Sequence, residues 1–217
     1  MNVDVLEQMP TLLPLEFFSV TSEVFYASIY PSSRVMRQSH LLPDTSEWLG
    51  EERFAELAMV WSEEGLCIEA FCDQPFQEAH YPLYQSGDAL EIFIDTRDVK
   101  TAGFATRFCH HFLVLPESVQ GVQALEVTHF RTEDTHPLCD PSDLTVTTQF
   151  HKQSYHFRVT IPASCLVGYD PQSFDKMGFT YRIHRYGGSP QHFAVSSDHF
   201  SIDQSPKLWA TLAMIRK

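Results

Sequence analysis

A repeated alternation of apolar and polar side chains, with a period of two residues, is the feature that most constrains the fold of this chain. Successive side chains of a β-strand point to opposite faces of its sheet, so this period predicts strands with one buried face. Runs with this pattern occupy residues 57–61, 66–72, 90–95, 107–115, 144–150, 155–161, 179–183 and 208–215. Many short strands with few helices predict an all-β sandwich or barrel of about ten strands.

Two pairs of these runs are separated by turns short enough for β-hairpins. Residues 62–65, which include a glycine, join the first pair, and residues 151–154 join the second. A short helix is expected near residues 48–54. No repeat, low-complexity tract or linker interrupts the 217 residues. We therefore expect one domain over residues 1–217, with residues 1–22 as an N-terminal arm.

The charge balance excludes some partners. The chain has 28 acidic and 15 basic residues and a formal net charge of −13. Such a surface repels the phosphates of nucleic acids and anionic membranes, and no stripe of basic residues offsets this locally. The sequence also lacks an apolar run of about 18 residues, so no transmembrane helix is predicted. Nucleic acid and membrane are therefore not expected as partners.

The cysteines and the start of the chain bear on the compartment. The five cysteines are odd in number and scattered, and three lie in predicted strands, which favours five free thiols in a reducing compartment. The first residues show no basic segment followed by an apolar one, so no signal peptide is predicted. We expect a cytoplasmic location. The cysteines are Cys67, Cys72, Cys109, Cys139 and Cys165.

Five segments, taken in order, resemble family-nine carbohydrate-binding modules and related DOMON-like domains. They are WSEEGL at 61–66, GDALEIFID at 87–95, FRVTIP at 157–162, MGFTYRIHR at 177–185 and LWATL at 208–212. The likeness extends from about residue 56 to residue 217. It implies a jelly-roll-like sandwich of two antiparallel sheets, one of them concave and facing a ligand.

The resemblance also implies which residues contact a saccharide. Tyr84 matches the aromatic platform, and Glu91 matches the glutamate that contacts the sugar. The family's arginine falls near Cys109 or His110, so that contact is lost unless Arg107 replaces it. The family's amide falls near Arg182, and its second stacking aromatic falls near residues 195–196, where the sequence has none. The nearest candidates for that aromatic are His192, Phe193, His199 and Phe200.

The alternation itself gathers polar side chains on one sheet face. Leu90, Ile92 and Ile94 are expected between the layers, with Glu91 on the opposite face and close to Arg182. A carboxylate beside arginines and histidines can bind an acid or a polyol through charge-assisted hydrogen bonds. The alternative is a solvated sheet face with salt bridges. The predicted ligand-binding residues are Tyr84, Glu91, Arg107, His111, Arg182 and His184.

Three other groups of residues bear on metal binding or catalysis. Adjacent His110 and His111 point to opposite faces and cannot share a metal, so His110 is expected in the core. Asp95 and Asp98 leave a strand together and could hold Ca²⁺, although an acidic turn without metal is the alternative. Residues 196–199 contain serine, aspartate and histidine but lack a nucleophile motif, so no catalytic triad is predicted there. No other cofactor is predicted.

Three functions remain open from the sequence. The leading hypothesis is a non-catalytic domain that binds a saccharide or another small polar ligand. The second is a cytoplasmic protein–protein interaction domain with no small-molecule site. The third is a hydrolase or isomerase that uses Glu91 and His111 as acid and base, which requires the two side chains within hydrogen-bond reach.

Overall fold

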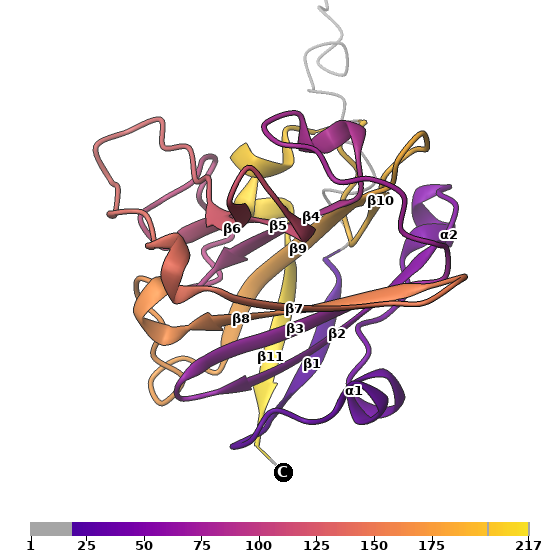
Figure 1. Cartoon of the computed structure of the whole chain (residues 1–217). Helices are drawn as coiled ribbons and strands as arrows, with labels where there is room; N and C mark the ends of the chain where they lie inside the picture. Colours follow the sequence, from indigo (N-terminus) through magenta and orange to yellow (C-terminus); the bar gives the residue numbers. More distant parts are fainter. Residues whose placement is uncertain (1–18, 199, 217) are drawn as a thin grey trace, which may run out of the picture.

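Eleven strands form one mixed sheet in residues 19–198 and 200–216, which the computed structural model describes (Figure 1). The strands are β1 (Thr21–Tyr26), β2 (Ala55–Ser62), β3 (Gly65–Cys72), β4 (Ala89–Asp95), β5 (Cys109–Val119), β6 (Val122–Glu126), β7 (Thr145–Phe150), β8 (Tyr155–Pro162), β9 (Lys176–His184), β10 (Gln191–His192) and β11 (Ala210–Ile215). The helices are α1 (Ser33–Ser39), α2 (Ser46–Leu49) and the 3-10 helices η3 (Tyr84–Ser86), η4 (Pro141–Asp143), η5 (Ala163–Cys165), η6 (Ile202–Gln204) and η7 (Pro206–Leu208). The abundance of short strands is as the alternation predicts.

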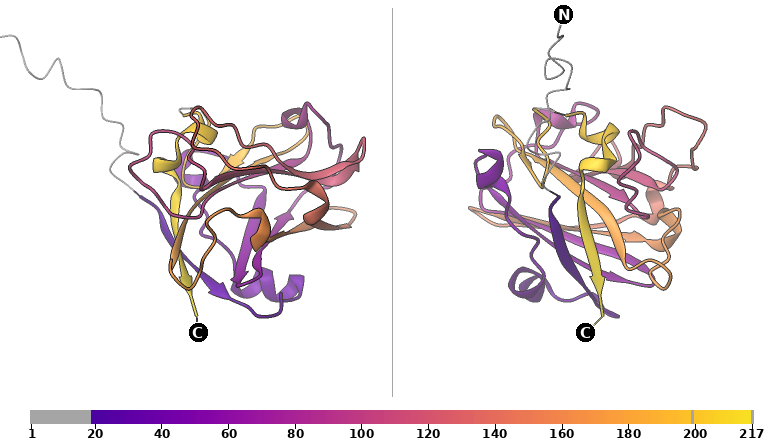
Figure 2. Two further views of the ribbon diagram at one scale, coloured as in Figure 1. Left: turned by 90° about the vertical axis from the view of Figure 1, so that its left-hand side faces the viewer. Right: turned by 180° about the vertical axis from the view of Figure 1, so that it is seen from behind.

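The sheet order corrects the expectation of two separate antiparallel sheets. The strands run β6-β5-β4-β9-β11-β1-β2-β3-β8-β7, with β10 paired to β9. Strand β1 pairs in parallel with both β11 and β2, and Figure 2 shows β1 beside β11. One continuous sheet therefore folds over itself, and β1 joins its two halves. The sequence pattern missed β1 because Val24 is its one fully buried residue, which leaves little alternation.

The two outer strands of this sheet approach each other, so the sheet is nearly closed like a barrel. Thr148 of β7 donates a side-chain hydrogen bond of 2.6 Å to the carbonyl of Pro116 in β5. Pro116 lies where the pairing of β5 with β6 shifts register, between Val114 and Val119. Beyond that contact, β6 and the start of β7 line a common hollow of about 410 Å³.

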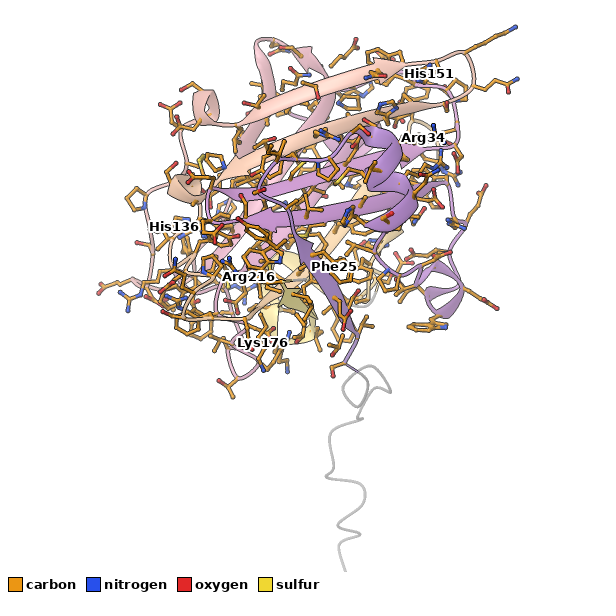
Figure 3. The ribbon with its side chains drawn as sticks, turned by 90° about the horizontal axis from the view of Figure 1, so that it is seen from below. Phe25, Arg34, His136, His151, Lys176 and Arg216 are labelled. Carbon is orange, nitrogen blue, oxygen red and sulfur yellow. A yellow bond between two sulfur atoms is a disulfide. The ribbon has the colours of Figure 1, made fainter. Side chains whose placement is uncertain are left out.

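The core lies between the two halves of the folded sheet. Leu90, Ile92 and Ile94 of β4 are at most 1% exposed and belong to the same apolar cluster as Ile68 and Phe157 of the opposite half. This confirms the predicted inward face of β4. On the outside, α1 lies over β2 and β3 (Figure 3), and none of the helices in residues 19–198 and 200–216 is long and apolar enough to cross a membrane.

The cysteines differ from the prediction of five free thiols. Cys139 and Cys165 form a disulfide, whereas Cys67, Cys72 and Cys109 are free and buried. The two bonded cysteines stand 26 residues apart in sequence. They flank the β7–β8 hairpin, which returns the chain to its starting point and brings them together. Disulfides persist in oxidising compartments, so the cytoplasmic location stays a prediction without the support of five free thiols.

Candidate ligand-binding site

A pocket of about 560 Å³ opens on the outer face of strands β4, β5 and β9. Glu91, His111 and Arg182 line it from the sheet, while Tyr84 of η3 and the segment at 197–198 and 200–203 complete its wall. This space, called here the Glu91 pocket, falls within the range of roughly 300–1,000 Å³ that small-ligand sites occupy. It lies on the side of β4 opposite the core.

Strand register brings the polar side chains of the Glu91 pocket together. Glu91 is paired directly with Arg182, and His184 lies two positions further along β9, opposite Ala89. On the other side of β4, His111 is paired with Phe93, two positions from Glu91. Residues that are opposite or two positions apart on one face of an antiparallel sheet lie within side-chain reach. Three strands thus surround one carboxylate with a guanidinium and two imidazoles.

The Glu91 carboxylate has no solvent exposure and forms four hydrogen bonds, two on each oxygen. Arg182 Nε donates to Oε1 at 2.6 Å, and His184 Nε2 lies 2.7 Å from the same oxygen. His111 Nε2 lies 2.8 Å from Oε2, and the Tyr84 hydroxyl donates to it at 3.2 Å. A carboxylate offers about four acceptor positions, so all of them are used. Glu91 is therefore a fixed anion that orients its neighbours.

The same contacts set the charges in the pocket. Burial alone raises the pKa of Glu91, but hydrogen bonds from His111, His184 and Arg182 outweigh it and hold that pKa far below the usual range. Burial, followed by the charge of Glu91, raises the pKa of Tyr84 to about 12. At neutral pH the pocket thus combines an ionised carboxylate, a neutral phenol and a guanidinium.

This arrangement suits recognition better than acid–base catalysis by Glu91. Glu91 and His111 are within hydrogen-bond reach, as the hydrolase or isomerase hypothesis requires. However, a general acid or base works best with a pKa near the operating pH, and the pKa of Glu91 lies far below it. Its acceptor positions are also filled. At the pocket surface, the Arg182 guanidinium retains N–H groups that can donate to a polar ligand, and the Tyr84 hydroxyl, whose hydrogen goes to Glu91, can accept from one.

The structure brings five of the six predicted ligand-binding residues together and separates one. Tyr84, Glu91, His111, Arg182 and His184 form the network just described. Arg107 does not join them, because its Nε pairs with the half-buried Asp134 at 3.1 Å. Strand β5 begins at Cys109 and Arg107 lies in the preceding turn, where the strand alternation does not apply. Arg107 therefore stands outside this network, and a role for it in ligand binding stays a prediction.

A second aromatic side chain, Phe200, lines the Glu91 pocket together with Tyr84. The resemblance leaves this position open among four candidates. Of the other three, Phe193 is fully buried in the core and His192 is also buried, while His199 lies outside the described residues. Phe200 stands in a loop without periodicity, so the alternation gives no signal for it. Two aromatics at one pocket are a suitable surface for the apolar faces of a sugar ring.

The candidate Ca²⁺ ligands Asp95 and Asp98 are engaged within the protein. Asp95 accepts backbone N–H bonds from Arg97 and Val99, at 3.0 and 2.6 Å. Asp98 lies 2.6 Å from the Lys100 ammonium and accepts a bond from the Thr211 hydroxyl. These contacts account for both carboxylates as a capped acidic turn, and Ca²⁺ there stays a prediction.

Two other groups in the described residues have metal-ligand composition. The first comprises His110, Glu126 and His136, whose ligand atoms all lie within 4.8 Å of one another. His110 is buried, as predicted, and its Nδ1 lies 2.9 Å from Glu126 Oε1. His136 Nε2 lies 2.8 Å from the same oxygen, so hydrogen bonds already join all three side chains. The second is Cys139, Asp143 and Cys165, in which the two sulfurs are bonded to each other.

Comparisons with known proteins bear on the fold. A family-nine carbohydrate-binding module from Caldicellulosiruptor kristjanssonii, solved in complex with cellotriose, superimposes with a TM-score of 0.67 and 15% identity, covering 91% of this chain and 94% of that one. The chain has the fold of a family-nine carbohydrate-binding module. The glucose complex of that family-nine module gives a TM-score of 0.67 at 14% identity, over 91% and 96% of the two chains.

A more distant solved structure has a similar fold. It is a putative carbohydrate-binding protein from Bacteroides uniformis, with a TM-score of 0.54 and 8% identity over 91% of this chain and 99% of that one. No protein-family model matches the chain, and a search of curated proteins gives no match either. At these identities the likeness establishes the fold, and the ligand has to be argued from the site itself.

Proposed function

We propose that this protein binds a saccharide in the Glu91 pocket. The observation that carries the proposal is the fixed Glu91 carboxylate beneath a pocket that also has two aromatic side chains, Tyr84 and Phe200. Sugars combine apolar ring faces with polar edges, and this pocket offers partners for both. Two of the solved structures that share the fold were obtained with cellotriose and glucose, which supports a saccharide as the ligand class.

The burial of the side chains supports separate roles within the proposed site. Glu91 is fully buried, whereas the side chains of Arg182 and His111 are 18% and 12% exposed. Arg182 and His111 therefore meet the sugar hydroxyls, together with the Tyr84 hydroxyl. Glu91 acts as a positioning residue that holds these three groups in place. This differs from the expectation that Glu91 contacts the sugar directly.

Isothermal titration calorimetry with glucose, cellotriose and a panel of other small saccharides tests the proposal. We expect at least one saccharide to bind the wild-type protein and Phe200→Ala to weaken that binding roughly ten-fold, which corresponds to about 1.4 kcal/mol. Phe104→Ala is the matched control, because Phe104 is an exposed phenylalanine outside the pocket. Equal weakening by the two variants, or no binding of any saccharide, would contradict the proposal.

A further inference from the structure

A hydrogen-bonded chain of serine, histidine and glutamate stands at the edge of the Glu91 pocket. The hydroxyl of Ser197, which lines this pocket, lies 2.8 Å from Nε2 of His192. Nδ1 of the same ring lies 2.7 Å from Oε1 of Glu51. These are the distances between nucleophile, base and orienting carboxylate that nucleophilic catalysis by serine requires. His192 precedes Ser197 by five residues and Glu51 precedes His192 by 141, so both partners lie outside the short motif at residues 196–199.

The contacts determine which nitrogen of His192 carries the proton. A carboxylate accepts hydrogen bonds, so Nδ1, which faces Glu51, is the protonated nitrogen. The backbone N–H of Ser197 also points at Nε2, at 3.3 Å, and that contact requires a lone pair there. The neutral ring therefore presents an acceptor to the Ser197 hydroxyl, which is the tautomer that a general base needs.

Neighbouring segments hold this geometry in place. Glu51 accepts a second bond, from the backbone N–H of His192 at 2.7 Å, so the carboxylate and the histidine are fixed to each other. Ala194 has a positive φ of 64°, which only a constrained loop maintains in a residue other than glycine. Its N–H donates to the buried Thr45 hydroxyl at 3.1 Å. This bend turns the chain so that Ser197 faces back toward His192.

From this geometry we infer that Ser197, His192 and Glu51 form an acyl-transfer site that cleaves esters of the saccharide held in the Glu91 pocket. The inference rests on the proposed function for its substrate class. Arg182 lines the same pocket and carries the kind of charge that stabilises an oxyanion. Ser197 thus shares its pocket with a cationic side chain, which a serine on an open surface lacks.

The reaction balances with water as the co-reactant. Ser197 Oγ attacks the ester carbonyl carbon while its proton passes to His192 Nε2, and the carbon–oxygen bond to the sugar breaks as that sugar oxygen takes the proton. Water then attacks the acyl-serine and gives a proton to Nε2, which returns a proton to Ser197 Oγ as the acyl–oxygen bond breaks and the carboxylic acid leaves. Glu51 stabilises the imidazolium that forms in both halves.

A fluorophosphonate probe and p-nitrophenyl acetate test the inference on the full chain. We expect the folded protein to be labelled on Ser197, as located by peptide mass spectrometry, and the urea-unfolded protein to remain unlabelled. Ser197→Ala should abolish labelling and ester hydrolysis. His192→Gln should slow both by roughly 10²–10⁴-fold, the usual contribution of a general base. Ser205→Ala is the control, because Ser205 lies in the same part of the chain but outside the pocket lining.

Labelling at another residue, or unchanged hydrolysis by Ser197→Ala, would overturn the inference. So would an absence of labelling in the folded wild-type protein. Since His192→Gln removes a buried hydrogen-bond partner, Glu51→Gln provides a second variant that keeps the ring and should still slow labelling. Calorimetry with Ser197→Ala separates the two proposals. If Ser197→Ala binds a saccharide and the wild-type protein is not labelled, acyl transfer alone is rejected. If the wild-type protein is labelled on Ser197 and Ser197→Ala binds no saccharide, the saccharide is rejected as the substrate class.

Discussion

Two buried glutamates, Glu91 and Glu126, stand on either side of strand β5, and each is joined to two histidines. The adjacent residues His110 and His111 point to opposite faces of β5, so one strand supplies a partner to both carboxylates. Glu91 lies under a pocket and is also bound by Arg182 and Tyr84. A glutamate joined to two histidines therefore occurs twice: Glu91 lies beneath an open pocket, and Glu126 lies in a buried cluster.

The Glu126 cluster, made of His110, Glu126, His136 and Thr128, joins the loop after β6 to the sheet. Glu126 Oε1 accepts the Thr128 hydroxyl at 2.6 Å, and Oε2 accepts the backbone N–H of Cys139 at 2.7 Å. His136 also contacts the carbonyl of Arg107, through Nδ1 at 2.7 Å. A carbonyl and a carboxylate are both acceptors, so His136 needs two N–H groups and is held as an imidazolium. This cluster is closed within the fold, whereas the one around Glu91 also lines the Glu91 pocket.

The largest change in stability should come from removing the Glu126 carboxylate. We expect Glu126→Ala to lower the free energy of unfolding by about 3–5 kcal/mol, because it leaves the buried His110 and His136 without their partner. Urea unfolding followed by circular dichroism measures this. Glu133→Ala, in the exposed part of the same loop, is the control and should change stability by less than about 0.5 kcal/mol. A loss of stability below about 1 kcal/mol in Glu126→Ala would contradict the stabilising role that distinguishes Glu126 from Glu91.

The disulfide next to the Glu126 cluster should give the next largest effect. Replacing Cys139 and Cys165 together by serine should cost about 2–4 kcal/mol, since the bond closes a loop in the unfolded chain. Saccharide binding should be unchanged, because neither cysteine lines the Glu91 pocket. Urea unfolding and calorimetry on the same variant measure both quantities. An unchanged free energy of unfolding would show that the bond does not constrain the chain.

Glu91→Gln should affect both stability and binding, which distinguishes it from Glu126→Ala. An amide keeps one acceptor oxygen but presents an NH₂ group to surrounding donors, so we expect a loss of about 1–3 kcal/mol in stability. Saccharide affinity should fall more than ten-fold as Arg182, His111 and Tyr84 lose their orientation. Calorimetry well below the melting temperature of the variant measures this. Wild-type affinity in Glu91→Gln would exclude a positioning role for Glu91.

The smallest effect should be a gradual pH dependence from the Glu126 cluster. Burial raises the pKa of Glu126, but hydrogen bonds from His110 and His136 outweigh it and lower that pKa from 4.5 to about 2. The stability that Glu126 provides is thus present above about pH 4.5 and lost as the pH falls toward 2. Burial lowers the pKa of His136, but Glu126 outweighs it and raises that pKa above 6.5.

His136 gives a pH dependence of stability with the opposite sign, on the alkaline side. Stability from His136 is fully present below pH 6.5 and lost as the pH rises through its raised pKa. We expect the free energy of unfolding, measured in urea from pH 3 to 9, to fall on both sides of a plateau. His136→Gln should remove the alkaline decline. A decline that persists in this variant would show that another group causes it.

The sequence predicts the position of a side chain well where the residue stands in a regular strand, and poorly elsewhere. The alternation of Leu90, Ile92 and Ile94 gave the inner face of β4, and therefore also the outward direction of Glu91. The registers that join three strands at Glu91 followed from the resemblance rather than from the alternation. Single-sequence periodicity shows which face a side chain takes but not which strand lies beside it.

Residues in loops were the ones that sequence reasoning missed. Phe200, the Cys139–Cys165 pair and the Ser197–His192 contact all depend on how loops return to the sheet. No periodicity governs such segments, so their positions are fixed by tertiary contacts alone. Arg107 lies apart from the other predicted residues for the same reason, because the predicted alternation extends beyond the start of β5 into a turn.

The near closure of the sheet has a consequence for how copies of this protein behave in concentrated solution. A strand at the edge of a sheet offers unpaired N–H and C=O groups to which another chain can add, and this is a common route to aggregation. Here Thr148 of β7 reaches the Pro116 carbonyl of β5, and the edges of β6 and β7 border the same hollow. Each edge thus shields the other from a passing strand. Variants that open this seam, such as Thr148→Val, should form fibrils more readily than the wild-type protein without any change in the Glu91 pocket.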